Sequence, residues 1–371
     1  MAVESAGKRE MELPGLEESP LAARQRMIQL VWRVWPWLFL VGLVIFFSIF
    51  GPGFFSVRSS MNVLTAASHV LLMALGQTFV IIAAGIDLST GWVVGLASVT
   101  GAVVMRDLYA SNGDEMLAIV AGIVAGLLVT LIPGFVNGIL IAKVRIPAFI
   151  ATMGMGFIVR GAALILSGGN VVPNLPPGLR TLGNESLLYV ARGQLYFLNK
   201  PEDLAQEELR TLVRIIPYPV LIALVTLLVC HWVLSRTQFG RHTYAIGGNP
   251  EAALRAGIRV DRHTIMLYML SAFTSGLGGI VYTARFAGGS YRAGEEALLM
   301  SIAAIVIGGT SLFGGEGTFT GTVVGARIIA VMQTGLVSMA VDPFWQFIAV
   351  GVVVVVAVMV DQARSRVMEG E

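Results

Sequence analysis

Asp87 is the most suggestive single residue for chemistry in this chain. It lies in a polar stretch, Gly85-Ile86-Asp87-Leu88-Ser89-Thr90-Gly91, between two long apolar runs. A carboxylate followed by hydroxyls can cap a helix, because its oxygens accept bonds from the free N–H groups of the first turn. The same side chains could line a water-filled path, since a helix broken inside a membrane exposes polar groups. Asp87, Ser89 and Thr90 are therefore candidates for both roles, which are compatible.

A second stretch of the same kind occurs late in the chain. It reads Gly308-Gly309-Thr310-Ser311-Leu312-Phe313-Gly314-Gly315 and again follows an apolar run. Thr310 and Ser311 have the same two interpretations as Asp87, a helix break or a path lining. The two breaks also suggest, as a hypothesis, that they mark distant halves of an internal duplication.

A third stretch predicts a short helix with well-defined ends. Asn249 is a preferred N-cap residue, and Pro250 has the backbone angle favoured at the first helical position. Glu251 suits the positive end of the helix dipole, and Gly257 supplies a left-handed stop. The segment between these signals is Ala252-Ala253-Leu254-Arg255, which has high helix propensity, and Gly248 precedes it. Such a helix is either an ordinary loop element or a rod that docks into a groove on a soluble partner.

Patterns typical of enzymes and metal sites do not occur in the sequence. There is no Gly-x-Ser-x-Gly elbow or His-Glu-x-x-His helix, and none of the lysines lies in a phosphate-binding Gly-Lys-Ser/Thr loop. The four histidines are scattered and the single cysteine, Cys230, lies in an apolar run. We therefore predict no catalytic residue, no metal site and no cofactor, and any ATP hydrolysis must come from another polypeptide.

The composition indicates an integral membrane protein. Apolar residues make up 56% of the chain and charged residues 13%, against roughly 25% charged residues in soluble domains. The chain also contains 43 glycines, and small residues allow helices to approach closely in lipid. A net charge of +2 gives no reason to expect a nucleic-acid partner.

Hydropathy predicts an all-α polytopic membrane protein with about ten transmembrane helices, some of them short or broken. A spanning helix needs about 20 mostly apolar residues. The candidate spans are residues 33–50, 62–83, 90–106, 116–141, 147–166, 217–235, 264–285, 297–312, 317–340 and 343–361.

Lysine and arginine placement predicts the topology. Most basic residues outside the spans fall on the side of both termini, which is typical of the cytoplasmic side. We expect an N-terminal tail (1–31), one membrane domain (32–365) and a C-terminal tail (366–371), with both tails cytoplasmic. The membrane domain has an external loop (167–216), with an amphipathic surface helix over 201–214, and a cytoplasmic loop (236–263). Arg160 and Arg327 fall inside spans, where ionisable residues raise a functional hypothesis.

The stretch Gly247-Gly248-Asn249-Pro250-Glu251-Ala252-Ala253-Leu254-Arg255-Ala256-Gly257-Ile258 closely resembles the coupling-helix loop of ribose- and xylose-type ABC transporter permeases. Further stretches resemble the same family in the family's order: residues 76–81, 85–89, 136–138, 143–150, 307–317 and 344–346. Two departures are the long external loop and Arg327, at a position that is usually apolar in the family.

The resemblance implies a homodimeric permease in the bacterial inner membrane. It also implies ATP-hydrolysing subunits docked at residues 248–257 inside and a periplasmic sugar-binding protein outside. The predicted function is uptake of a monosaccharide, a pentose or similar sugar, or a related polyol, by alternating access. An ion-coupled secondary transporter or a facilitator of a neutral polar solute is the alternative, although no acidic residue lies in the middle of a span. A membrane enzyme is a further alternative, although the spans contain no glycine-elbow serine, His-Glu-x-x-His helix or carboxylate pair. A channel or a structural membrane protein is another, but neither explains the capped cytoplasmic helix.

Overall fold

The structure is a computed structural model of the chain. It describes residues 20–191, 194–198, 212–342, 344–353, 355, 356 and 359, with side chains from residue 34 onward. The predicted C-terminal tail and residues 1–19 lie outside the described residues.

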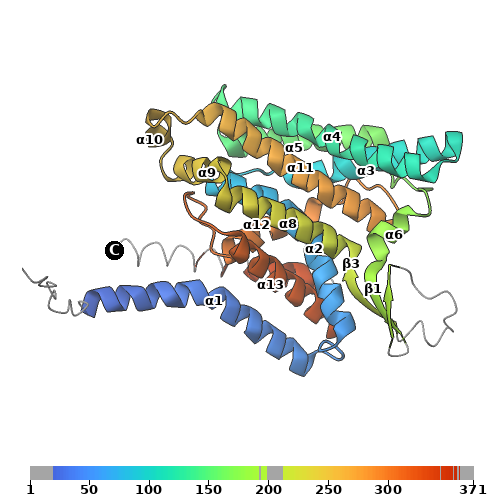
Figure 1. The fold of residues 1–371 in the computed structure, drawn as a ribbon, viewed down its shortest axis with the longest axis horizontal. Coiled ribbons are helices and arrows are strands. Elements are labelled where there is room, and N and C mark those ends of the chain that lie inside the picture. Colours follow the sequence, from blue (N-terminus) through green and yellow to red (C-terminus); the bar gives the residue numbers. More distant parts are fainter. Residues whose placement is uncertain are drawn as a thin grey trace, which may run out of the picture.

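Helices dominate the described chain (Figure 1). Their bounds are α1 Pro20–Phe50, α2 Val57–Ile82, α3 Thr90–Asn112, α4 Glu115–Ala142, α5 Ala148–Ser167, α6 Leu179–Asn184, α8 Tyr218–Arg236, α9 Gln238–Gly248, α10 Pro250–Arg255, α11 Val260–Phe286, α12 Glu295–Ile307 and α13 Phe319–Ser338. An apolar helix over Phe344–Val353 follows. Because α1 begins at Pro20, its first turns occupy part of the segment predicted as an N-terminal tail.

Seven of the described helices are long and apolar enough to cross a membrane: α2, α3, α4, α5, α8, α11 and α13. The predicted span over 297–312 is wrong in its extent, since α12 has 13 residues and ends at Ile307. At 1.5 Å per residue that is about 20 Å, short of the roughly 30 Å hydrocarbon core. The apolar parts of α1 and of 344–353 are also short, so the predicted count of about ten spans is not reached within the described residues.

The prediction of an all-α fold is wrong in the long loop. A three-stranded antiparallel sheet in the order β2-β1-β3 forms from β1 Ser186–Ala191, β2 Gln194–Phe197 and β3 Val213–Pro217. Apolar residues in β1 provide the driving force, with Tyr189 only 1% exposed. The predicted surface helix over 201–214 is wrong at its end, where residues 213 and 214 are in β3; residues 201–211 are outside the described residues.

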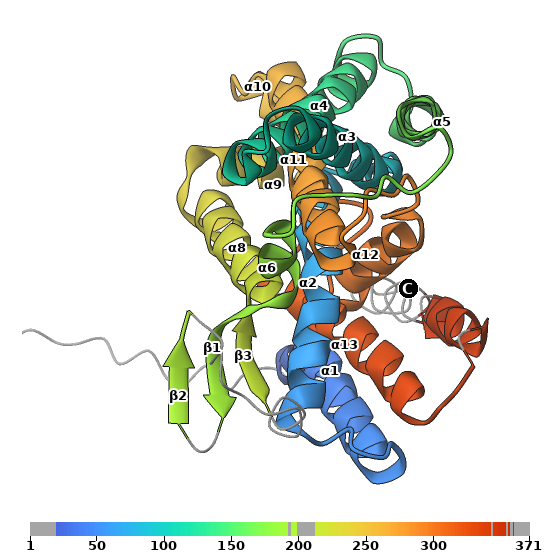
Figure 2. The same cartoon turned by 90° about the vertical axis from the view of Figure 1, so that its right-hand side faces the viewer.

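Helices α2 and α11 form the centre of the bundle (Figure 2). In α2, 83% of the most apolar window is buried, and in α11 61%, against 22% in α8 and 33% in α4 and α5. The outer helices therefore present apolar side chains outward, which suits a lipid environment. Between α12 and α13, close backbone approach at glycines adds to the packing of apolar side chains. A Cβ on Gly325 would lie 1.8 Å from the Ala304 carbonyl oxygen, so no larger residue fits there.

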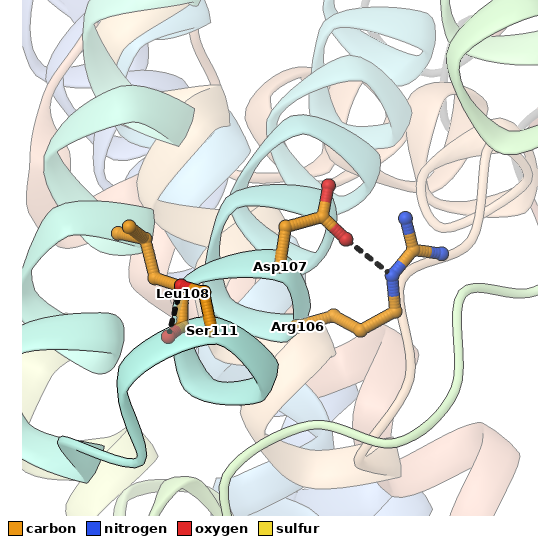
Figure 3. Close-up of polar contacts among 4 residues, drawn as sticks. All are labelled: Arg106, Asp107, Leu108 and Ser111. Carbon is orange, nitrogen blue, oxygen red and sulfur yellow. Dashed lines mark hydrogen bonds and ion pairs between the residues drawn. The ribbon is translucent and has the colours of Figure 1, made fainter.

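The two ends of the bundle carry different elements (Figure 1). The start of α1 lies at the same end as α9 and α10, and the sheet with α6 lies at the opposite end (Figure 1). We call these the α10 end and the sheet end. Near the sheet end, α3 finishes with exposed polar groups (Figure 3). Arg106 Nε lies 2.8 Å from Asp107 Oδ1, and Ser111 donates to the Leu108 carbonyl. Such an exposed pair contributes little stability, but it shows that this end of α3 has a polar surface.

Candidate functional site

Asp87 lies at the centre of a buried turn between α2 and α3. Its Oδ1 accepts hydrogen bonds from the backbone N–H of Ser89 at 3.0 Å and from the Ser89 hydroxyl at 2.6 Å. Its Oδ2 accepts from the Ser271 hydroxyl of α11 at 2.9 Å. The side chain is 3% exposed. The carboxylate therefore closes its own turn and joins that turn to α11, but the N-cap position of α3 belongs to Ser89, whose side chain makes no cap bond.

Gln77 extends this cluster to two more helices. Its Nε2 donates to the Asp87 carbonyl at 3.1 Å and to Thr90 Oγ1 at 2.7 Å. Its Oε1 accepts from the Ser301 hydroxyl of α12 at 2.6 Å. The amide thus uses its donors and its acceptor to join α2, the turn, α3 and α12. All these side chains are buried, so each lost bond would leave an unpaired polar group.

Residues from α4, α5 and α11 surround the same turn. Asn137 Nδ2 donates to the Ser89 hydroxyl at 3.0 Å, and Leu88 N donates to Thr152 Oγ1 at 3.1 Å. The Tyr268 hydroxyl donates to the Ile86 carbonyl at 3.4 Å. Asn137 Oδ1 is buried and has no partner in the described structure, so it is an acceptor that a water or a solute hydroxyl could use. We call Gln77, Asp87, Ser89, Thr90, Asn137, Ser271 and Ser301 the Asp87 network.

The second break carries Thr310 and Ser311. Thr310 is fully buried, and its hydroxyl has no partner among the described residues. Ser311 makes local bonds, accepting from the Phe313 N–H at 3.2 Å. The structure brings Asp87, Ser89 and Thr90 together, but it places Thr310 and Ser311 outside their network.

The two breaks are nevertheless neighbours. The Gly315 N–H donates to the Ile82 carbonyl at the end of α2, at 2.8 Å. One helix turn away, the hydroxyls of Thr78 in α2 and Thr322 in α13 are 3.0 Å apart. The free Ile82 carbonyl at the end of α2 is therefore satisfied by an N–H group of the second break.

The capped helix predicted after Gly248 forms as α10. Asn249 Oδ1 accepts from the Ala252 N–H at 2.9 Å, Pro250 is the first helical residue, and Gly257 has φ +85°. Ala253 is buried, whereas Leu254 is 61% exposed. Glu251 and Arg255 form an exposed ion pair at 3.5 Å. Leu254 is therefore an exposed apolar side chain beside an exposed ion pair on this helix.

A cavity of about 670 Å³ separates α10 from the first break. Pro250, Glu251 and Leu254 form one wall, and Tyr268 with the segment Ala83–Gly85 forms the other. The α10 helix therefore projects from the bundle rather than packing on the Asp87 network.

The two arginines predicted inside spans have different surroundings. Arg160 of α5 lies 3.3 Å from Glu295 at the start of α12, so an ion pair compensates its charge. Arg327 of α13 is exposed and borders a cavity of about 390 Å³ between α1, α2 and α13. Neither residue contacts the Asp87 network.

Comparison with known proteins gives the family. The family described as branched-chain amino acid transport system / permease component matches residues 59–360. The chain belongs to this family. The match covers all seven long apolar helices apart from the first residues of α2, so the family assignment concerns the whole bundle.

Curated relatives match over most of their own length. The ribose import permease protein of Bacillus subtilis is 37% identical over 333 residues, which is 90% of this chain and 94% of the relative. The fructose import permease protein of Rhizobium meliloti is 32% identical, covering 87% of this chain and 83% of the relative. The xylose transport system permease protein of Escherichia coli is 32% identical, covering 88% and 91%. No solved structure matches the chain. The resemblance to sugar permeases seen in the sequence motifs is therefore confirmed.

Proposed function

We propose that this permease is the membrane subunit of an ATP-driven importer for a monosaccharide or a related polyol. The relatives named above import ribose and fructose or transport xylose. The main structural support for ATP as the energy source is α10, a capped helix that projects from the bundle and exposes Leu254. ATP-binding subunits dock on this helix, and a solute-binding protein docks at the sheet end. The α10 end is then cytoplasmic, and both termini share that side.

The Asp87 network supports a neutral, hydroxyl-rich solute. Its side chains are a carboxylate, amides and hydroxyls, and no basic side chain joins them among the described residues. The orphan acceptor of Asn137 and the orphan hydroxyl of Thr310 are groups that sugar hydroxyls or their waters can satisfy. We propose that the two breaks border the translocation path. Two copies of the chain, each with about ten spans, form the transporter, and the solute crosses by alternating access.

A branched-chain amino acid is the second candidate solute, because the family description names that class. An amino acid carries a carboxylate and an ammonium group, and a path for it needs compensating partners for both charges. The network offers a carboxylate for the ammonium group but no cation for the carboxylate within the described residues. This asymmetry favours the neutral solute.

The decisive test is reconstitution of the purified permease in proteoliposomes. The permease alone, with labelled ribose, xylose, fructose or leucine, should accumulate no solute against a gradient. Addition of its ATP-binding subunits, its binding protein and ATP should start uptake of one solute. Accumulation by the permease alone, driven by a proton or sodium gradient, would contradict the proposal and favour a secondary transporter.

The same preparation tests α10. Glu251→Lys reverses a charge on the exposed surface, and Asn249→Pro removes the cap, so both should abolish uptake and ATPase coupling. Membrane insertion should be unchanged, because neither residue is buried. Glu251→Gln is the matched control, since it keeps size and hydrogen bonding while removing an exposed ion pair of little energetic weight. Unimpaired uptake in both test variants would count against docking at α10.

A further inference from the structure

The last turn of α9 sits directly on the hydrogen bond that joins the two helix breaks. A Cβ on Gly247 would lie 1.8 Å from the Ile82 carbonyl oxygen and 2.6 Å from Gly315 N, the two atoms of that bond. Only a residue without a side chain can approach both backbones so closely. Three segments that are far apart in sequence therefore meet at one point: the end of α2, the second break and α9.

A second contact fixes α9 to the same place. The Tyr244 hydroxyl donates to the Gly317 carbonyl at 2.6 Å, just before α13 begins. Burial raises the pKa of the Tyr244 hydroxyl above its ordinary value, so the group stays a hydrogen-bond donor at physiological pH. We call the contacts of Gly247 and Tyr244 with Ile82, Gly315 and Gly317 the break junction.

The rest of α9 is firmly attached to the bundle. The Thr243 hydroxyl lies 2.9 Å from His263 Nε2 at the start of α11. The Phe239 ring packs on Phe79 of α2 and on His263, with ring centroids 5.9 Å and 4.3 Å apart. A displacement of α9 must therefore move the ends of α2 and α11 or break these contacts.

The α10 helix has no comparable contact with the breaks. The cavity of about 670 Å³ lies between α10 and the segment Ala83–Gly85, so a push on α10 meets empty space in that direction. Asn249 is at once the last cap of α9 and the first cap of α10. The C-terminal end of α10 is joined to α11 through residues 256–259, and its N-terminal end is joined to α9 through Asn249. The connection through Asn249 is the route that leads to the break junction.

We propose that Gly247 and Tyr244 are positioning residues that transmit motion of α10 to both helix breaks at once. When docked subunits move α10, α9 follows through Asn249 and shifts Ile82 together with residues 315–317. The turn that holds Asp87 begins directly after Ile82, so the polar network rearranges in the same step. This inference rests on the proposed docking of ATP-binding subunits at α10.

Two glycines provide a matched test. Gly247→Ala places a methyl group on the junction, whereas a Cβ on Gly154 in α5 meets nothing within 4 Å. Both variants leave the α10 surface unchanged, so both should still bind the ATP-binding subunits in a pull-down assay. We expect Gly247→Ala to lower ATP-driven uptake by about tenfold or more, as crowding in a packed interior does. ATP hydrolysis should also lose its response to the loaded binding protein, and Gly154→Ala should behave as wild type.

Tyr244→Phe keeps the ring and removes only the hydroxyl, so it serves even where Gly247→Ala fails to fold. The variant should unfold within a few degrees of wild type and should still bind the ATP-binding subunits. Its solute-stimulated ATP hydrolysis should fall about threefold or more, because the loss of one hydrogen bond has an effect of about that size. Wild-type coupling in Tyr244→Phe, or equal uptake in Gly247→Ala and Gly154→Ala, would overturn the inference. Wild-type permease that binds no ATP-binding subunit would instead overturn the proposed function, and this inference with it.

Discussion

The environment of Asp87 is unusual for a buried carboxylate. Its oxygens accept from one backbone N–H and two hydroxyls, but no basic side chain is among the partners that the described structure gives it. A buried charge without a cation is costly unless such donors satisfy it. The hydrogen bonds from Ser89 and Ser271 therefore hold the carboxylate in place. A substitution of Asp87 that cannot accept these bonds loses their stabilising free energy.

Replacement of Asp87 separates hydrogen bonding from charge. Asp87→Ala removes every side-chain acceptor and should destabilise the permease by about 2 kcal/mol or more, because the buried donors of Ser89 and Ser271 lose their partner. Asp87→Asn keeps one acceptor and can donate to the Ser271 hydroxyl, so its stability should equal or exceed that of wild type. Thermal unfolding in detergent measures both, with Ser271→Ala as a control that removes a single bond. Equal midpoints for Asp87→Ala and wild type would contradict this account.

At the residue scale, sequence reasoning found part of the site. Asp87, Ser89 and Thr90 stood out because they interrupt an apolar run. Gln77 and Asn137 were noticed only within family-like stretches, and Ser271 and Ser301 were not noticed at all. Single polar residues inside a helix have two interpretations, a local bond to the preceding turn or a bond to a neighbouring helix. Only the packing of α2 against α11 and α12 shows that these side chains meet at Asp87.

At the element scale, the two breaks share more than their glycines. Thr90-Gly91-Trp92-Val93-Val94-Gly95 starts α3, and Thr320-Gly321-Thr322-Val323-Val324-Gly325 starts α13. In both, the two glycines face carbonyl oxygens of or beside α12: those of Gly294 and Tyr291 for α3, and those of Gly308 and Ala304 for α13. This gives the hypothesis of an internal duplication a specific pattern. The glycines of α3 contact the segment that precedes α12, and the equivalent glycines of α13 contact the end of α12.

The contact between α2 and α13 can be locked to test whether the breaks move. The hydroxyls of Thr78 and Thr322 are 3.0 Å apart, so paired cysteines at these positions should form a disulfide on mild oxidation. Because the proposed junction shifts Ile82 together with residues 315–317, the oxidised double variant should keep ATP-driven uptake close to that of the reduced protein. Cys230→Ala provides the background, since Cys230 is the only native cysteine and is buried. Loss of uptake on oxidation, restored by reduction, would show instead that the two breaks shift relative to each other.

The errors in predicted elements have physical causes. Hydropathy extended the span 297–312 through Gly308 and Gly309, because glycine does not interrupt an apolar average, although Gly309 has φ +84° and ends the helix. The sheet was missed because its strands are short and lie in a loop with charged and proline residues. Pairing between Tyr189 and Arg214 joins residues across the undescribed segment, and no local pattern encodes such a long-range pairing.

At the scale of the whole molecule, the two ends have separate tasks in the proposed importer. The α10 end presents an exposed helix on which the ATP-binding subunits dock, and the sheet end presents a small β-sheet on which the solute-binding protein docks (Figure 1). The break junction lies nearer the α10 end, beside α9. Energy would thus enter at one end and the solute at the other, with the Asp87 network between them.

This arrangement makes a prediction about the sides of the membrane. Single cysteines at Leu254, which is 61% exposed at the α10 end, and at Arg106, near the sheet end, should both react with a maleimide in detergent. In intact spheroplasts, a membrane-impermeant maleimide should label the cysteine at 106 but not the one at 254. Permeabilised cells should show both labelled, and Cys230→Ala again removes the native thiol.

The labelling pattern decides more than orientation. Because α10 can meet cytoplasmic ATP only from the inner side, labelling of residue 254 in intact spheroplasts would place α10 where no ATP-hydrolysing partner works. That result would contradict docking at α10 and the transmission through Gly247 together, whatever the solute. Labelling at residue 106 alone would place α10 on the cytoplasmic side and the sheet end on the outer side. The Asp87 network would then lie between the side from which the solute enters and the helix on which the ATP-binding subunits act, as alternating access requires.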